Sequence, residues 1–161
     1  MATTQRPLPG LGVLVLNKEN QILIGKRSDC ALYGIPGGYL EKFESWEVGA
    51  ARELKEEADL DVDPNKIHVI KVFNALEKSK NYHNVAIIVL CEYPEGQEVK
   101  TMEPEKCAGW EWWNLTDLEK RIEEIFYPNR QLVVEYKDLL DAEYLRKVLS
   151  STPKFKSSYS A

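Results

Sequence analysis

The most constraining feature of this sequence is a strongly acidic segment that follows a proline and a pair of glycines. Residues 38–60 read GYLEKFESWEVGAARELKEEADL, and the turn Pro36-Gly37-Gly38 leads into them. Four acidic residues fall within seven positions: Glu53, Glu56, Glu57 and Asp59. In a helix, like charges one turn apart are destabilising by ~0.2–0.5 kcal/mol per pair, and the C-terminal end disfavours anions. We therefore expect something positively charged to bind here.

The segment predicts a helix from about residue 45 to about residue 58, with Ser45 as its N-cap. On a helical wheel of about 100° per residue, one narrow face is made of small and apolar residues. These are Ala50, Ala51, Leu54 and Ala58. One flank of this face carries the carboxylates of Glu53, Glu56 and Glu57. Oxygen ligands without a nearby Cys or His pair favour Mg²⁺, or Mn²⁺ in its place, over zinc.

An acidic cluster of this kind is usually only a solvated helix face, here with Arg52 pairing Glu56 one turn away. The flanking residues argue against that interpretation. Their spacing resembles the Nudix box, which is Gly, five residues, Glu, seven residues and then Arg-Glu-aliphatic-x-Glu-Glu-x-Gly-aliphatic. The matching positions are Gly38, Glu44, Arg52, Glu53, Leu54, Glu56, Glu57 and Leu60. Asp59 replaces the glycine of the family, and Asp is among the few other residues that tolerate the left-handed end of a helix.

The resemblance to Nudix hydrolases implies an α/β (α+β) fold, with a mixed β-sheet in an α/β/α sandwich. It also implies roles for the residues of the box. Glu53 and Glu57 would bind the metal, and Glu56 would be a ligand or the base that activates water. Gly37 or Gly38 could offer a backbone carbonyl to the same metal. Arg52 would orient the glutamates, while Glu44 would hold the preceding loop or join an outer shell of the metal.

Two further segments resemble the MutT-homologue subgroup of nucleoside triphosphate diphosphatases. One is Asn81-Tyr82-His83, and the other is the run from Met102 to Cys107 before Gly109-Trp110-Glu111-Trp112. Members of this subgroup, which includes a human thiopurine- and dGTP-hydrolysing enzyme, are cytosolic homodimers that release monophosphate and pyrophosphate. This chain departs from the human member at Gly34 and at Phe126-Tyr127-Pro128. A preference for guanine therefore does not carry over.

Candidate substrate-binding residues lie in and outside the box: Arg27, Gly37, Gly38, His83, Phe126 and Tyr127. Arg27 ends a predicted strand, where it is either a guanidinium fork for phosphates or simply an exposed strand end. His83 is either a base or base-contacting donor, or a structural histidine. The rings of Phe126 and Tyr127 could stack on a nucleobase, with Phe126 the better candidate. Trp46 is expected to pack in the core.

Composition narrows the classes of partner. The chain has 161 residues, enough for one domain over residues 1–161, with flexible ends at 1–9 and 150–161. Its net charge of −5 argues against binding to nucleic-acid polymers or membrane surfaces. An acidic protein that binds a polyphosphate needs cations at the site. Three widely spaced cysteines and no leading apolar run predict a reduced, cytoplasmic protein.

The remaining elements follow from apolar patterns and turn residues. Strands are predicted at 11–16, 21–27, 67–76, 82–93 and 109–113, with 82–93 central in the sheet. Further helices are predicted at 116–125, with Thr116 as cap, at 129–140 and at 141–149.

The sequence thus predicts a Mg²⁺-dependent diphosphatase that hydrolyses (d)NTPs or modified (d)NTPs to the monophosphate and pyrophosphate. The nearest alternative keeps the chemistry and changes the substrate to ADP-ribose or a nucleotide sugar. A catalytically silent nucleotide-binding domain is disfavoured because Glu53, Glu56 and Glu57 are all present. Messenger RNA decapping would require an extended basic surface that the net charge does not suggest.

Overall fold

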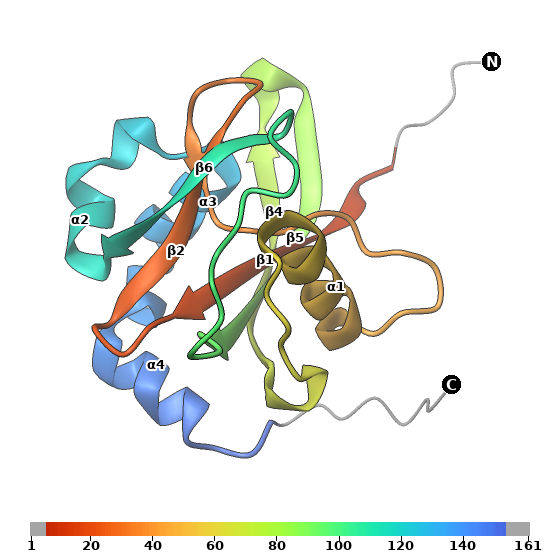
Figure 1. The fold of residues 1–161 in the computed structure, drawn as a ribbon. Coiled ribbons are helices and arrows are strands. Elements are labelled where there is room, and N and C mark those ends of the chain that lie inside the picture. The colour runs from red at the N-terminus through yellow and green to blue at the C-terminus, as the bar shows by residue number, and fades with distance from the viewer. Residues whose placement is uncertain (1–5, 154–161) are drawn as a thin grey trace.

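A computed structural model describes residues 6–153 of the chain (Figure 1). Six strands form one mixed sheet: β1 Leu8–Leu16, β2 Gln21–Arg27, β3 Tyr33–Gly34, β4 His68–Glu77, β5 Tyr82–Glu92 and β6 Cys107–Asn114. The α-helices are α1 Trp46–Ala58, α2 Leu115–Lys120, α3 Tyr127–Glu135 and α4 Ala142–Leu149. Short 3₁₀ turns occupy Pro64–Lys66, Lys78–Lys80, Ile122–Glu124 and Lys137–Leu140. Within residues 6–153, no helix has the length and apolarity needed to cross a bilayer.

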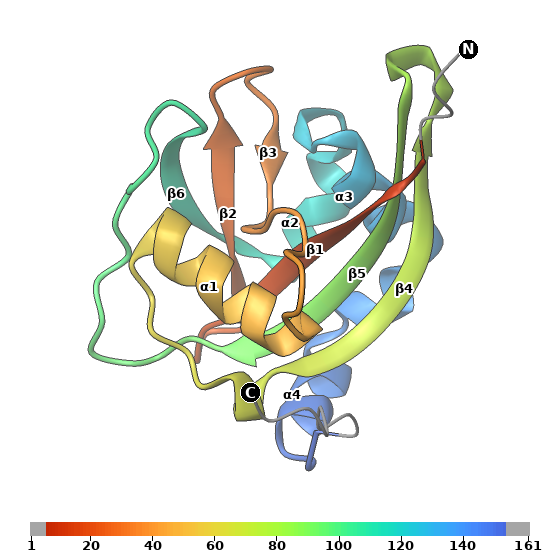
Figure 2. The same ribbon diagram turned by 90° about the vertical axis from the view of Figure 1, so that its right-hand side faces the viewer.

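Helices cover both faces of the sheet, so the predicted α/β/α arrangement is confirmed. Figure 2 shows α1 in front of the sheet and α2 and α3 behind it. The strand order is β3-β2-β1-β5-β4, with β6 on the other edge of β2. β1 runs parallel to β5, whereas β5 is antiparallel to β4 and β2 is antiparallel to β6. As predicted, β5 is an interior strand, because β1 and β4 flank it.

Two apolar layers hold the helices on the sheet. The layer under α1 includes Ala50, Leu54 and Ala58, which are fully buried against Val13 and Val89. The small helix face predicted on the wheel is therefore the packing face, and it lets α1 approach the strands closely. The opposite layer joins alternate residues of the same strands to the C-terminal helices. It includes Leu14, Ile24, Ile88, Trp113, Leu132 and Leu145.

The sheet splits along one side of β1, and the split positions the loop before α1. β1 and β2 pair at Leu16 and Ile22 and then diverge, so that β3 takes the other end of the β2 edge. The vacated edge of β1 is satisfied by the glycine loop: Leu11 N–H donates to Gly38 O at 2.7 Å and Val13 N–H donates to Pro36 O at 2.8 Å. A buried strand edge needs such partners. The loop is thus fixed against β1 immediately before α1.

Both predicted ends of α1 are confirmed. The Ser45 hydroxyl accepts a hydrogen bond from Val48 N–H at 3.3 Å, which is an N-cap. At the other end, Asp59 adopts the left-handed conformation with φ 55° and ψ 30°. Its N–H and that of Leu60 bond back to the carbonyls of Lys55 and Leu54. Asp59 therefore forms the left-handed C-terminal cap of α1, the position at which the family has glycine.

Several predicted boundaries are wrong. Residues 8 and 9 belong to β1, because Leu8 and Pro9 continue its register beside Asn84 and Val85. Positions 1–5 and 154–161 of the predicted flexible ends lie outside the described residues. β3 lies in a segment predicted as loop.

The C-terminal helices are shorter than predicted. The helix predicted for 116–125 ends at Lys120 and continues as a 3₁₀ turn, and Asn114 rather than Thr116 is its cap residue. The helix predicted for 129–140 begins earlier, at Tyr127, and stops at Glu135. In both cases a 3₁₀ turn follows the helix, and a buried side chain at that point, Ile125 or Leu140, packs in the layer behind the sheet.

Candidate active site

The three glutamates of the box lie on the flank of α1 that faces the glycine loop. Glu53 is 8% exposed, Glu57 is half-buried and Glu56 is exposed. All three line one cavity together with Arg52. The sequence therefore placed these four side chains correctly relative to one another.

Arg52 is the centre of a hydrogen-bond network. Its Nη1 donates to Glu53 Oε1 at 2.8 Å and to Glu56 Oε2 at 3.1 Å. Its Nε and Nη2 donate to the two carboxylate oxygens of Glu44 at 3.1 and 2.8 Å, and Nη2 also reaches the carbonyl of Tyr39 at 3.1 Å. Paired forks of this kind fix geometry as well as charge. Arg52 thus sets the positions of Glu53 and Glu56, and Glu44 anchors it to the loop.

The glycine loop contacts the glutamates directly. Gly37 N–H donates to Glu57 Oε2 at 2.9 Å. Its φ is +150°, and a Cβ at this position would lie 2.0 Å from Leu11 O, so only glycine fits. A Cβ on Gly38 would lie 2.5 Å from Glu53 Oε1. Gly37 is therefore required by the backbone, whereas a side chain at position 38 would displace the Glu53 carboxylate.

Burial makes two of these carboxyl groups weak acids. It raises the pKa of Glu57 to about 7, against the Gly37 hydrogen bond and with added repulsion from Glu53 and Glu103. Burial also raises the pKa of Glu53, although the Arg52 ion pair opposes it. Glu44 differs, because the hydrogen bonds from Arg52 lower its pKa. Glu53 and Glu57 are therefore the cluster members whose charged form is disfavoured by burial.

The oxygen-only donor set suits a hard divalent cation. In residues 6–153, however, no three Asp, Glu, His or Cys side chains are already gathered at metal-binding distances. Arg52 and Gly37 instead hold the glutamates from opposite sides. The carbonyls of Pro36 and Gly38 point to β1.

The cavity has a volume of about 600 Å³, which is the size of a small-molecule site. The box residues line part of it. The lining also includes Arg27, Phe126 and Asn129, which lie close together around Gly34, and Gly12, Tyr82, Asn84 and Ile88. It opens where β1 and β2 diverge, so the split in the sheet creates the site.

Arg27 lies at the mouth of this cavity, but its guanidinium is already paired. Nε and Nη2 donate to the two oxygens of Asp29 at 3.0 and 2.7 Å. The guanidinium also lies over the Phe126 ring, 4.2 Å from its centroid. Tyr127 packs against Phe126 and Tyr82, at 4.2 and 4.8 Å between ring centroids, and is not among the described lining residues. Of the two predicted stacking rings, Phe126 alone reaches the cavity.

His83 lies outside the cavity that the other candidate site residues line. It is exposed, its Nε2 lies 3.4 Å from Asn74 Oδ1, and it is not among the lining residues. Alternation along β5 instead points Tyr82 and Asn84 into the cavity. Asn84 is buried and donates to the Tyr82 hydroxyl at 2.7 Å. The signal was present in the sequence, because 82, 84, 86 and 88 share the face opposite to 83.

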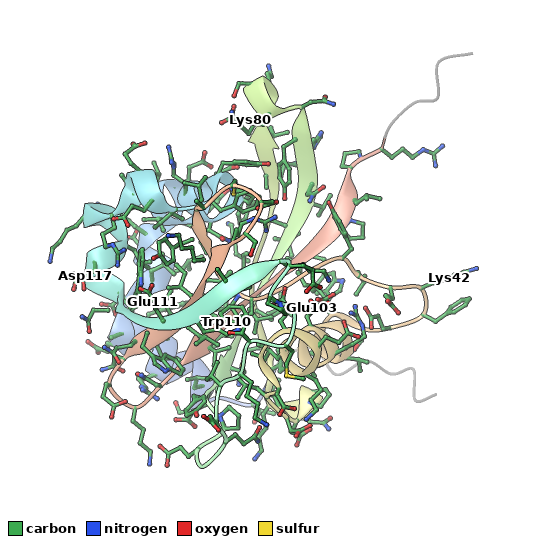
Figure 3. All side chains as sticks on the ribbon, turned by 45° about the horizontal axis from the view of Figure 1, so that its top comes forward. Lys42, Lys80, Glu103, Trp110, Glu111 and Asp117 are labelled. Atoms are coloured by element: carbon green, nitrogen blue, oxygen red, sulfur yellow. The ribbon has the colours of Figure 1, made fainter. Side chains whose placement is uncertain are left out.

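The loop between β5 and β6 crosses the C-terminal part of α1. Met102 N–H donates to Glu57 O at 3.1 Å, and Trp110 Nε1 points to the same carbonyl at 3.4 Å. Figure 3 shows Glu103 and Trp110 beside this end of the helix. Glu103 Oε1 accepts from Lys106 Nζ at 2.8 Å, whereas its buried Oε2 has no protein partner. The sequence singled out this segment by resemblance without assigning a site residue in it.

Comparison with known proteins identifies the family. The NUDIX domain family matches residues 6–133. The RNA pyrophosphohydrolase of Pelagibacter ubique is 29% identical over 130 residues, 68% of this chain and 79% of that protein. A putative 8-oxo-dGTP diphosphatase of Bacillus subtilis is 48% identical over 48 residues, 30% of this chain and 32% of that protein.

A solved structure shows the same fold. It is the bifunctional NMN adenylyltransferase/ADP ribose pyrophosphatase of Francisella tularensis, complexed with AMP and a manganese ion. The TM-score is 0.70 and the identity 18%, over 87% of this chain and 44% of that one. With the box residues gathered at one cavity, these matches show that the chain belongs to the Nudix family of hydrolases, which act on phosphoanhydride bonds.

Proposed function

We propose that this protein is a Mg²⁺-dependent diphosphatase that cleaves (d)NTPs or modified (d)NTPs to the monophosphate and pyrophosphate. The observation that carries the proposal is the cavity itself. Its lining combines the carboxylates of Glu53, Glu56 and Glu57 with the Phe126 ring and the Asn129 amide. A nucleotide has the matching division into polyphosphate and base. Mn²⁺ could replace Mg²⁺.

The box residues would divide the work of hydrolysis. Glu53 and Glu57, with Glu56 and the Gly37 carbonyl, would hold the cation, which neutralises phosphate charge and lowers the pKa of bound water. Arg52 keeps Glu53 and Glu56 in place through the bonds described above. Glu56, which is exposed and held by Arg52 Nη1 at 3.1 Å, is either a further ligand or the base that takes a proton from the attacking water.

Substrate preference is proposed from the relatives and the resemblance. The B. subtilis protein, named for 8-oxo-dGTP, is similar over a short region. The segments at residues 81–83 and 102–107 resemble the triphosphate-cleaving subgroup with its human member. We extend from that subgroup two further properties, a homodimeric assembly and a cytoplasmic location.

Two other substrates have specific support. ADP-ribose is named for the F. tularensis protein with the same fold. RNA is named for the P. ubique protein that this chain matches over most of both lengths. A net charge of −5 weighs against a polymeric substrate, because RNA binding depends on basic surface.

A substrate panel tests the proposal. The purified protein is assayed with Mg²⁺ against the four dNTPs, 8-oxo-dGTP, ADP-ribose and an RNA with a 5′-triphosphate, with phosphate and pyrophosphate measured separately. We expect pyrophosphate from at least one triphosphate, with the highest kcat/KM of the panel. A higher kcat/KM for ADP-ribose or for RNA would replace the proposal with that activity.

A further inference from the structure

The cavity is short of positive charge for a polyphosphate ligand. Its described lining contains six acidic side chains: Asp29, Glu41, Glu53, Glu56, Glu57 and Glu105. The same lining contains three cationic ones: Arg27, Arg52 and Lys106. Any part of the phosphate charge that a divalent cation does not meet must be met by one of these three.

Both arginines are committed to the protein. Arg27 is held by two hydrogen bonds to Asp29 and by the face of Phe126. Arg52 is held by Glu44, Glu53 and Glu56 together, and its side chain is 22% exposed. Moving the Arg52 guanidinium to a ligand would leave Glu44 and Glu53, whose side chains are only 10% exposed, without their partner, which is costly. Asp29 is 61% exposed, so Arg27 is held by its paired hydrogen bonds and by the Phe126 ring rather than by burial.

Lys106 is held much more loosely. Its ammonium makes one ion pair, with Glu103 Oε1 at 2.8 Å, and its side chain is 62% exposed, whereas that of Glu103 is 25% exposed. A single contact from a lysine this exposed is weakened by water and is easier to exchange than the several contacts of each arginine. The main chain beneath it is fixed, because Lys106 O accepts from Ser28 N–H and Lys106 N–H donates to Glu103 O, both at 2.9 Å. The ammonium can therefore change position while the backbone of Lys106 stays in place.

Lys106 lines the same cavity as Glu53 and Glu57. The hydrogen bond to Glu103 raises the pKa of Lys106 most, and the charge of Glu103 and, after it, the charges of Glu57 and Glu53 raise it further. Those two glutamates are the proposed ligands of the cation, so the phosphates of a substrate would lie beside them. A lysine offers three donors on a flexible stem, which suits phosphate oxygens.

We propose that Lys106 is a substrate-binding residue whose ammonium leaves Glu103 and pairs with the polyphosphate of a bound nucleotide. Glu103 then acts as an internal competitor that occupies the lysine in the free protein. This inference rests on the proposed function for the class of ligand. It assigns a role to the segment 102–107, which the box does not explain.

The competing interpretation is that the Lys106–Glu103 pair only fixes the loop. The two interpretations predict opposite effects on ligand affinity when Glu103 is lost. If the pair is structural, losing either partner loosens the loop and weakens binding. If Lys106 serves the ligand, losing Glu103 frees the lysine and strengthens binding, whereas losing the lysine weakens it.

The test is equilibrium binding of an α,β-methylene nucleoside triphosphate, which resists the proposed cleavage, in the presence of Mg²⁺, followed through the indole NMR signal of Trp110, which lines the cavity. We expect Lys106→Gln to weaken binding about 10-fold, as for loss of one charge-assisted contact, and Lys106→Arg to restore most of it. Glu103→Gln should tighten binding about 3-fold or more. Lys100→Gln is the matched control, because Lys100 lies in the same loop, 53% exposed, and pairs with Asp59 at 2.7 Å.

The proposal is overturned if Lys106→Gln binds like the parent, if Glu103→Gln and Lys106→Gln weaken binding alike, or if the parent does not bind the analogue. Hydrolysis is scored separately on the parent. If the affinities of the variants change as expected but no triphosphate releases pyrophosphate, the role of Lys106 in binding is supported and the proposed function is refuted. If the parent releases pyrophosphate but Lys106→Gln binds the analogue as tightly as the parent, the proposed function is supported and the role of Lys106 is refuted.

Discussion

At the scale of single residues, Glu57 gives the clearest physical signature of the site. Its pKa is raised from 4.5 to about 7 by burial. The folded protein therefore binds more protons than the unfolded chain between these pH values, and the free energy of unfolding falls as pH rises through that window. The loss is roughly 2–3 kcal/mol in the metal-free protein.

Glu57→Gln should remove most of this pH dependence, because a glutamine stays neutral. The measurement is urea unfolding in EDTA from pH 5 to pH 8. Glu98→Gln, an exposed substitution with the same charge change, should keep the parental slope. Parallel curves for Glu57→Gln and the parent would show that Glu57 titrates normally.

Residue positions within the box were predictable, and those outside it were largely not. Glu53, Glu56 and Glu57 follow from helix periodicity alone, since 3.6 residues per turn places them on one flank. His83 was chosen for its chemistry, but the two-residue period of β5 turns it away from the cavity. Asn129 could not be found, because it reaches the site only through the packing of α3 behind the sheet.

At the scale of elements, the C-terminus of α1 shows how a departure from the family pattern is tolerated. Asp59 adopts the left-handed conformation and pairs with Lys55 at 2.6 Å and Lys100 at 2.7 Å. These bonds, first with Lys100, lower its pKa to about 2. The ion pairs offset the backbone strain that a glycine would avoid.

Two substitutions at this position should therefore differ. Asp59→Ala keeps the strain and loses both ion pairs, so it should lower the melting temperature by a few degrees. Asp59→Gly loses the pairs but relieves the strain, and it should stay nearer to the parent. Differential scanning calorimetry at pH 7 decides this, and an alanine variant as stable as the glycine variant would remove the role of the left-handed cap.

Elements with local signals were predicted well, and elements that depend on distant contacts were not. α1 carries its cap, its small face and its C-terminal signal within one segment. β3 has only two residues, and it forms because β2 leaves β1 and Tyr33 O accepts from Phe126 N–H. No sequence pattern near Tyr33 predicts that contact.

At the scale of the whole molecule, the split sheet explains why the box is used as a site. The loop 36–40 replaces β2 along β1, which places Gly37 under Glu57 and opens the cavity beside it. The family was predictable because the box encodes this local arrangement. The shape of the rest of the cavity was not, since β1, β2, β5 and α3 all contribute to it.

Assembly is a separate prediction at this scale. The protein exposes large apolar side chains on the outer face of β4, with Val72 at 41% and Leu76 at 51% exposure, and the resembling subgroup is homodimeric. We expect light scattering at micromolar concentration to give about twice the chain mass of 18.5 kDa. A mass of one chain would contradict this prediction and leave the site unaffected.

The central claim is that the carboxylates of α1 form a metal-dependent hydrolytic site. It is tested most directly by pyrophosphate release from a triphosphate with Mg²⁺, compared between the parent, Glu57→Gln and the Glu98→Gln control. We predict a loss of about 10²–10⁴ in turnover for Glu57→Gln, and parental turnover for the control. Turnover by Glu57→Gln close to that of the parent would contradict the account.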